Sequence, residues 1–318
     1  MTLKTFMRVI LTLFIFILPL TGQAKTWLCE TYDICRSGSR PNSSAPAQPT
    51  TNSTININPA AVPTTKTTGI EALYYKGLFD FALVKGLGRV GAAISPSNTE
   101  ETFFGAPGFE VPEEYAERKS EGNKLPSQKV ALATAFNIFS NKRNGLKKFE
   151  LNLGVIGKYN KISYKVSPGG GVSGIAGPFT FGYSAYADSF IWNKDAFDAD
   201  PNLEILYNVE TYSAGIFLDS VALDYSELRI YPKDARDSKV SMLTGSLLLK
   251  DGIITLSWRK ETSDRYAFNF TTHMLEERRD KEDLFGGVQV AATKNIMIGA
   301  FYNYYLLHEI SLGVTAFF

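Results

Sequence analysis

Hydrophobic and polar residues alternate along most of the second half of the chain. In the final segment, residues of one parity are hydrophobic and those of the other parity are small or polar. The hydrophobic set is Ile310, Leu312, Val314, Ala316 and Phe318. Successive side chains of a β-strand point to opposite faces, so the pattern predicts a strand with one oily and one polar face.

The same alternation recurs in segments of about 9–12 residues, which is long enough for a tilted strand to cross a bilayer. In one segment Phe149, Leu151, Leu153 and Val155 oppose Lys148, Glu150, Asn152 and Gly154. In another, the expected oily set is Leu203, Ile205, Tyr207 and Val209, opposed by Glu204, Asn208 and Glu210. The charged residues inside strands are therefore expected on the less oily face.

Counting such segments from Gly69 onward gives 14 candidate strands. They are GIEALYY, FDFALV, RVGAAIS, KVALATAFNIFS, KKFELNLGVIGKY, PFTFGYSAYADSF, LEILYNVETYSAGIFL, VALDYSELRIY, KVSMLTGSLLL, GIITLSWRK, RYAFNFTTHM, LFGGVQVAA, NIMIGAFYNYY and HEISLGVTAFF. The number falls to about 12 if FDFALV and RVGAAIS form an irregular or inward element. Short polar breaks such as 141–145 and 293–295 predict hairpins. The longer breaks at 96–128, 161–177 and 275–283 predict loops on one side.

Parity alone does not say whether the oily faces point inward or outward. A soluble single barrel of this many strands would be too wide for side chains to fill. Aromatic residues such as Tyr159, Tyr231 and Trp258 fall at strand ends, as an interfacial girdle requires. With the export signal described below, these features predict an all-β fold: a closed antiparallel transmembrane β-barrel of about 12–14 strands.

The N-terminus resembles a secretory signal. Lys4 and Arg8 precede the short apolar run Val9–Leu20, and small residues follow at Gly22 and Ala24. This predicts a signal peptide over residues 1–24, cleaved near Ala24, and a bacterial outer-membrane location. The alternative is an uncleaved anchor, but the run is shorter than the roughly 20 residues of a spanning helix.

We expect residues 25–68 to form a periplasmic or luminal N-terminal segment with a linker, and residues 69–318 to form the barrel. The stretch from Ser37 to Thr68 is rich in Ser, Thr, Pro and Asn and cannot form a core of its own. The chain has two cysteines, and in an exported protein Cys29 and Cys35 are candidates for a small disulfide loop.

The remaining composition argues for no enzyme and no cofactor. The 33 basic and 32 acidic residues nearly balance, which gives no reason to expect nucleic acid as a partner. The two histidines, His273 and His308, lie in no recognisable catalytic motif. SPGGGVSGIAGP lacks the Lys-Ser/Thr of a phosphate loop and predicts a flexible loop, and LEERRDKED predicts a solvated one.

Asn58, Pro59 and Ala60, followed shortly by the first predicted strand, resemble the Asn-Pro-Ala segment of the FadL family of outer-membrane channels for hydrophobic compounds. The resemblance implies 14 strands, an N-terminal plug in the lumen and a C-terminal aromatic residue. It makes Asn58, Pro59 and Ala60 plug or gate candidates. From the residues alone, the segment is a turn that starts the barrel.

We therefore expect passive transport of small, hydrophobic solutes. The candidates for an outer hydrophobic-solute pocket are Phe103, Phe104, Phe109 and Val111. The expected partners are outer-membrane lipids, such solutes, and the barrel-assembly machinery, which would recognise the strand ending in Phe318. The alternative function is a structural or adhesion barrel with a blocked lumen that acts through its surface loops.

Overall fold

The computed structural model describes most of the chain after Asn58. The described residues are 58–75, 78–96, 129–143, 146–191, 198, 204–218, 220–232, 238–249, 251–263, 266–269, 274–277, 281–303 and 309–318. None of the helices in these ranges has the length and hydrophobicity to span a membrane.

The described residues are mainly β-strands, preceded by the short 3₁₀ helix η3 (Pro59–Ala61). The strands are β1 (Thr67–Tyr75), β2 (Leu78–Gly86), β3 (Val90–Ser95), β4 (Lys129–Arg143), β5 (Leu146–Asn160), β6 (Val166–Ala176), β7 (Phe179–Phe190), β8 (Ile205–Leu218), β9 (Val221–Pro232), β10 (Ser238–Leu249), β11 (Gly252–Ser263), β12 (Tyr266–Asn269), β13 (Met274–Glu277), β14 (Lys281–Thr293), β15 (Ile296–Asn303) and β16 (Glu309–Phe317).

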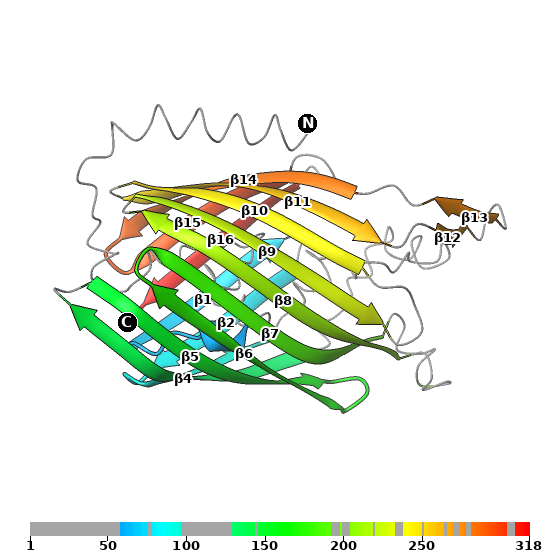
Figure 1. The fold of residues 1–318 in the computed structure, drawn as a ribbon, viewed down its shortest axis with the longest axis horizontal. Coiled ribbons are helices and arrows are strands. Elements are labelled where there is room, and N and C mark those ends of the chain that lie inside the picture. Colours follow the sequence, from blue (N-terminus) through cyan, green and yellow to red (C-terminus); the bar gives the residue numbers. More distant parts are fainter. Residues whose placement is uncertain are drawn as a thin grey trace.

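Fourteen of these strands form one closed antiparallel barrel, with β12 and β13 paired in a separate small sheet. The barrel closes between β1 and β16, where Gly69 lies opposite Phe317 and Tyr75 opposite Ser311. Thr68 and Phe318 also exchange two backbone hydrogen bonds. Figure 1 shows the strands tilted around the barrel and the β12–β13 hairpin projecting beyond it. The predicted closed meander is confirmed.

The two ends of the barrel differ in their connections. At the end where β1 begins and β16 finishes, the described turns are short, as at Gly177–Pro178 and Lys294–Asn295. The opposite end carries the long connections, including residues 96–128 between β3 and β4. Short turns at one end and longer loops at the other are typical of outer-membrane barrels. Below, the two ends are called the turn end and the loop end.

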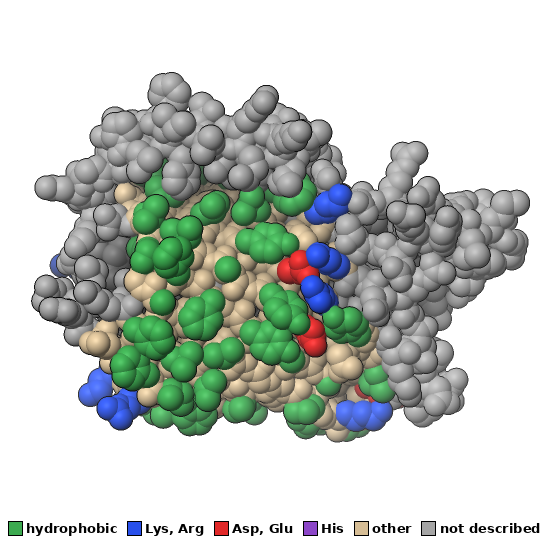
Figure 2. Space-filling view, in the orientation of Figure 1, with side chains coloured by type: hydrophobic (Ala, Val, Ile, Leu, Met, Phe, Trp, Pro, Cys, Tyr) green, Lys and Arg blue, Asp and Glu red, His purple; other side chains and the backbone are tan. Residues whose placement is uncertain are grey.

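The barrel is hydrophobic on the outside and polar on the inside. Leu132, Val155 and Leu312 are 58%, 57% and 49% exposed on the outer surface. The inward residues Ser184, Thr211 and Ser257 are fully buried. Figure 2 shows hydrophobic side chains spread over the visible wall. The predicted faces of the segments around Leu153 and Leu312 are therefore correct.

The strand count of 14 is reached through two offsetting differences from the sequence prediction. The glycine-rich stretch predicted as a loop over 161–177 contains a barrel strand, β6 (Val166–Ala176). The segment RYAFNFTTHM, predicted as a barrel strand, contains β12 and the first residue of β13, which pair outside the barrel wall. Both FDFALV and RVGAAIS lie in the wall, as β2 and β3, so the lower count is wrong.

Two further predictions fail near the loop end. The stretch LEERRDKED, predicted as a loop, contains the last three residues of β13 and the start of β14. On β8, Val209 is buried and faces the lumen, whereas Asn208 is exposed on the outer surface with Glu210 on the same parity. The expected oily face of this segment is therefore turned inward, because Val209 joins an apolar patch inside the barrel.

Candidate functional site

Residues 58–66, the luminal segment, lie inside the barrel against its wall. Their contacts run from the β2–β3 turn to the middle of β5 and β6. η3 starts at Asn58, whose side-chain oxygen accepts a hydrogen bond from the backbone N–H of Ala60 at 3.1 Å. Asparagine is a favoured N-cap and proline is favoured at the first helical position, so Asn-Pro-Ala encodes this turn locally.

The wall beside the luminal segment is built from glycines that leave room for its backbone. A Cβ added to Gly154 would lie 2.2 Å from the backbone nitrogen of Ala60. One added to Gly91 would lie 2.3 Å from the carbonyl oxygen of Pro63. Real Cβ contacts are not this short, so larger residues at these positions require the luminal segment or the wall to move.

Hydrogen bonds connect the luminal segment to the wall at three points among the described residues. Asn58 Nδ2 donates to the carbonyl of Val172 at 3.3 Å, and Ser173 Oγ donates to the carbonyl of Ala60 at 2.9 Å. Near the turn end, the backbone N–H of Gly88 donates to the carbonyl of Thr64 at 2.7 Å. The segment is therefore positioned along its length by polar contacts to β6 and to the β2–β3 turn.

The luminal segment also covers an apolar patch on the inner wall. Val62 packs there, 2% exposed, in one buried cluster with side chains from β2 to β8. The other members are Val84, Ala93, Ala131, Ala133, Ala135, Ile156, Tyr186 and Val209, with Tyr207 packed against them. This inner apolar patch has more members than either of the two other buried apolar clusters among the described residues.

Elsewhere the described inner wall carries many hydroxyl groups beside two smaller buried apolar clusters. One cluster is Leu248, Ile253, Met297 and Phe317, and the other is Leu228, Val240 and Met242. Ser257 Oγ donates to Thr244 Oγ1 at 2.9 Å, and Thr315 Oγ1 donates to Glu71 Oε2 at 3.2 Å across the closure of the barrel. Further inward hydroxyl residues are Thr180, Ser184, Thr211, Ser213, Ser226, Ser246 and Thr255. The described inner wall thus has one large apolar patch beside the luminal segment, and a mixture of hydroxyl groups and smaller apolar clusters on the other strands.

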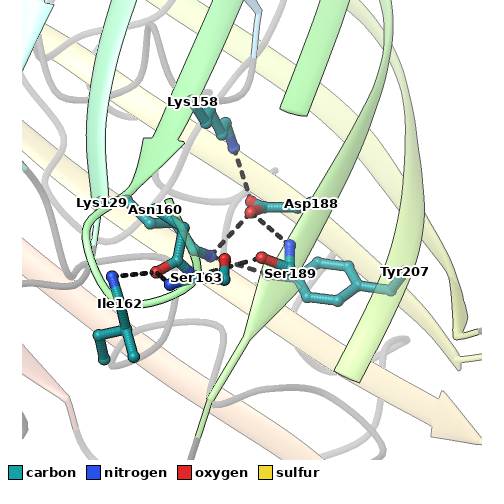
Figure 3. Close-up of polar contacts among 8 residues, drawn as sticks. All are labelled: Lys129, Lys158, Asn160, Ile162, Ser163, Asp188, Ser189 and Tyr207. Carbon is teal, nitrogen blue, oxygen red and sulfur yellow. Dashed lines mark hydrogen bonds and ion pairs between the residues drawn. The ribbon is translucent and has the colours of Figure 1, made fainter. Parts of the chain in front are cut away.

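A buried ionic group lies inside the barrel at the loop end (Figure 3). Asp188 of β7 accepts from Lys129 of β4 at 2.8 Å and from Lys158 of β5 at 3.1 Å. The three side chains, here called the lysine–aspartate cluster, are at most 5% exposed. Because the partners come from three strands, the cluster joins β4, β5 and β7 across the lumen wall.

Aromatic and polar neighbours complete the lysine–aspartate cluster. The Lys158 ammonium lies 3.7 Å from the centre of the Tyr186 ring, and Lys129 Nζ donates to the Tyr207 hydroxyl at 3.3 Å. The first is a close cation–π contact. Beside the cluster, Asn160 accepts from the N–H of Ile162 and donates to Ser189, which fixes the β5–β6 turn.

Within the barrel, the strand ladder is shortest between β2 and β3. Only Leu83–Gly86 of β2 pair with β3, from Ile94 back to Gly91. A side-chain hydrogen bond of 2.9 Å from Ser95 Oγ to the carbonyl of Phe81 continues the contact toward the loop end. This part of the wall therefore depends on fewer backbone pairs than the β4–β5 or β7–β8 pairings.

The structure places only part of the predicted site. Asn58, Pro59 and Ala60 lie in the lumen, as the plug hypothesis requires. The remaining candidates, Phe103, Phe104, Phe109, Val111, Cys29, Cys35, His273 and His308, lie outside the described residues. Among the residues that the structure covers, no group of three His, Cys, Asp or Glu side chains is arranged to hold a metal.

Sequence reasoning did not identify Lys129, Lys158 and Asp188. A signal was present, because Lys158 and Asp188 are charged residues inside long strand segments and on their polar parity. Charged residues at such positions in a membrane barrel face the lumen. Their mutual contact depends on strand register, which the alternation of residue types does not specify.

No protein-family model matches the chain, and no curated protein matches it. Solved structures that are similar include the outer membrane channel DcaP of Acinetobacter baumannii, with 8% identity, 79% of this chain and 96% of that chain covered, and a TM-score of 0.39. Omp33 of Acinetobacter baumannii is 9% identical, with 79% and 96% coverage and a TM-score of 0.36. OmpT, an outer membrane protein of Vibrio cholerae, is 6% identical, with 79% and 96% coverage and a TM-score of 0.37.

Proposed function

We propose that the protein is a passive channel of the bacterial outer membrane for small, hydrophobic solutes, closed by its own luminal segment. The observation that carries this proposal is the position of residues 58–66 inside a barrel that is hydrophobic outside and polar inside. The FadL-like resemblance of Asn58-Pro59-Ala60 also implies an N-terminal plug. Three features of the described residues support the proposal.

The first feature is the outer surface. Leu132, Val155 and Leu312 are exposed on this surface. A soluble protein would bury such side chains in its interior, because burying each one stabilises the fold by roughly 1.5–3 kcal/mol. Here such side chains surround a closed sheet with no free edge among the barrel strands. Lipid is the solvent that favours both properties, since it provides no partners for unpaired backbone groups.

The second feature is the luminal segment. Individual hydrogen bonds such as that from Ser173 hold it, and glycines such as Gly91 and Gly154 leave room for its backbone against the wall. A segment held by contacts worth about 1 kcal/mol each can leave and return without unfolding the barrel. This makes displacement of residues 58–66 a physically accessible gating step.

The third feature is the inner apolar patch, which supports the hydrophobic solute class. When Val62 and its neighbours leave, Val84, Ala133 and Ile156 become available to a hydrophobic solute at the same place. The solute would replace the contacts that the luminal segment makes. Passage then needs no energy source, because the solute moves down its own gradient.

Reconstitution of the mature chain in liposomes tests this function. We expect uptake of small hydrophobic solutes, and faster uptake when residues 58–62 are deleted. Ala133→Asp, which places a carboxylate in the apolar patch, should slow hydrophobic uptake. Ser257→Asp, among the hydroxyl groups outside this patch, is the matched control. Uptake that does not exceed that of empty liposomes, in both the wild type and the deletion variant, contradicts the channel.

The second candidate function is a structural or adhesion barrel with a blocked lumen. The near-complete burial of inward residues such as Ser184, Thr211 and Ser257 favours it, since these groups are not open to a wide aqueous pore. This function predicts no solute uptake in liposomes and no conductance in planar bilayers, both with and without residues 58–62.

A further inference from the structure

Four charged side chains interrupt the hydrophobic outer surface on neighbouring strands. They are Glu210 of β8, Glu227 and Arg229 of β9 and Lys239 of β10, here called the outer charge cluster. Their parity is that of the lipid-facing residues, as shown by the exposed Tyr212 and Tyr225 beside them. Figure 2 shows basic and acidic side chains gathered at one margin of the hydrophobic surface, over this region.

The outer charge cluster is an ordered group. Glu227 accepts from Arg229 Nε at 2.8 Å through one oxygen and from Lys239 Nζ at 2.6 Å through the other. The Arg229 guanidinium lies 5.1 Å from the centre of the Tyr212 ring. The Tyr212 hydroxyl in turn donates to Glu210 at 2.7 Å. Glu227 thus holds both cations in place, and the ring of Tyr212 supports the guanidinium.

Its height on the barrel is set by the residues above and below it. On the outward face of β9, Leu223 and Tyr225 lie toward the turn end and Tyr231 toward the loop end. A charged side chain costs about 2–4 kcal/mol at the midplane of a bilayer and almost nothing at its interface. Because two acidic and two basic side chains lie together on adjacent strands, we place this part of the outer surface at the headgroup level of the outer leaflet.

The two cations remain available to a ligand although both contact Glu227. The side chains of Arg229 and Lys239 are 47% and 45% exposed, whereas that of Glu227 is only 11% exposed. Arg229 also bonds to Tyr231, yet both cations keep nearly half of their side-chain surface open to a ligand. Glu227 is thus largely buried while Arg229 and Lys239 are exposed on the outer surface, and this arrangement favours an anionic ligand.

We propose that Arg229 and Lys239 bind a phosphate group of a glycolipid headgroup in the outer leaflet. Arginine and lysine together supply the charge-assisted hydrogen bonds that phosphate favours, and a lipid at this height brings its acyl chains onto Leu223 and Ile216. Glu227 is a positioning residue that orients the two cations. The inference rests on the proposed membrane location of the barrel.

The test uses the full mature chain in detergent and native mass spectrometry. The probes are diphosphorylated lipid A, dephosphorylated lipid A with the same acyl chains, and inorganic phosphate. We expect selective binding of the diphosphorylated lipid and a Kd increase of about tenfold or more in R229Q/K239Q, because two charge-assisted contacts are lost. Lys294→Gln, which removes an exposed lysine in the β14–β15 turn at the opposite end, should leave the Kd unchanged.

Several outcomes overturn the inference. They are equal binding of both lipids, unchanged binding by R229Q/K239Q, tight binding of inorganic phosphate alone, and a change of oligomeric mass without a change of lipid affinity. Heat-modifiable migration of each variant shows that its barrel is folded, and R229K/K239R keeps the charges if the double glutamine variant does not fold. A chain that fails to insert into vesicles contradicts the proposed function instead, so the two failures are distinguishable.

Discussion

The Ser173 hydroxyl of β6 donates a 2.9 Å hydrogen bond to the backbone carbonyl of Ala60, 113 residues earlier in the chain. This contact joins the wall of the barrel to the luminal segment. Removing the hydroxyl with Ser173→Ala should weaken the docked state by about 1 kcal/mol, or about fivefold in population. We expect a higher open probability in planar bilayers, with the barrel still folded.

The control for this prediction is Ser257→Ala, which removes a buried hydroxyl that bonds to Thr244 and not to the luminal segment. Its open probability should match that of the wild type. Equal open probabilities for Ser173→Ala and Ser257→Ala would show that the contact to Ala60 does not keep the segment docked.

The close approach of Gly154 to Ala60 gives a second prediction. A side chain at position 154 would start 2.2 Å from the Ala60 nitrogen, so Gly154→Val should expel residues 58–62 from the wall. At Gly157 an added Cβ meets Val166 at an ordinary 3.5 Å, so Gly157→Val is the matched control on the same strand. We expect Gly154→Val alone to increase solute uptake by liposomes. Equal uptake by the two variants would contradict the close packing at Gly154.

Asp188 is the acceptor for two buried lysines, and its loss should be costly. Asp188→Asn leaves Lys129 and Lys158 without their shared carboxylate, which we expect to lower the free energy of unfolding by about 3–5 kcal/mol. Urea unfolding from vesicles measures the difference. Replacing all three residues by apolar ones of similar size should restore much of the loss, because it also removes the desolvated charges. A triple variant less stable than Asp188→Asn would refute this explanation.

Glu204 and Lys165 form an ion pair between the connections at the loop end, outside the strands. Burial alone would raise the pKa of Glu204. Hydrogen bonds from Lys165, Ser163 and Ser189, together with the charge of Lys165, outweigh burial and leave this pKa below the usual value. The pair therefore stabilises the fold above the unfolded-state pKa of about 4.3, and this contribution disappears as the pH falls through the lowered pKa.

We expect Glu204→Gln to lower the free energy of unfolding by about 1 kcal/mol or less at pH 7, since Lys165 is largely exposed. The difference from the wild type should vanish in acid, below the folded-state pKa. Unfolding curves at several pH values measure it. A difference that grows on acidification would have the wrong sign for this ion pair.

The sequence was sufficient to predict the closed barrel and its inside-out faces, because alternation over long strands is a local property. Leu153 and Leu312 lie outside as expected. The Asn-Pro-Ala turn was also found locally, since Asn58 caps the helix that Pro59 begins. Its docking in the lumen followed only from the family resemblance, because Ala60 and Ser173, which are in contact, lie 113 residues apart in the chain.

The failures have physical causes. Glycine disfavours strands, so β6 read as a loop, yet Gly171 is needed there because a Cβ would lie 2.4 Å from Asn58 Oδ1. The alternation assigns Val209 to the outer face because its neighbours Asn208 and Glu210 are polar. The outward residues are instead Asn208 and Glu210, at the height where the outer surface becomes polar. Alternation shows only that the two faces of a strand differ in polarity. Near the boundary of the bilayer the outward face can be the polar one, as it is at Glu210.

Spin labels on single cysteines test the central claim most directly, in a chain with Cys29 and Cys35 replaced by serine. Collision with oxygen and with a water-soluble nickel complex is measured by electron paramagnetic resonance after reconstitution in vesicles. Labels at Leu132, Val155 and Leu312 should meet oxygen and be shielded from nickel, whereas labels at Ser184 and Ser257 should lack this lipid signature. Nickel access at Leu132, Val155 and Leu312 that matches access at exposed turn residues such as Lys294 would contradict a lipid-facing outer surface.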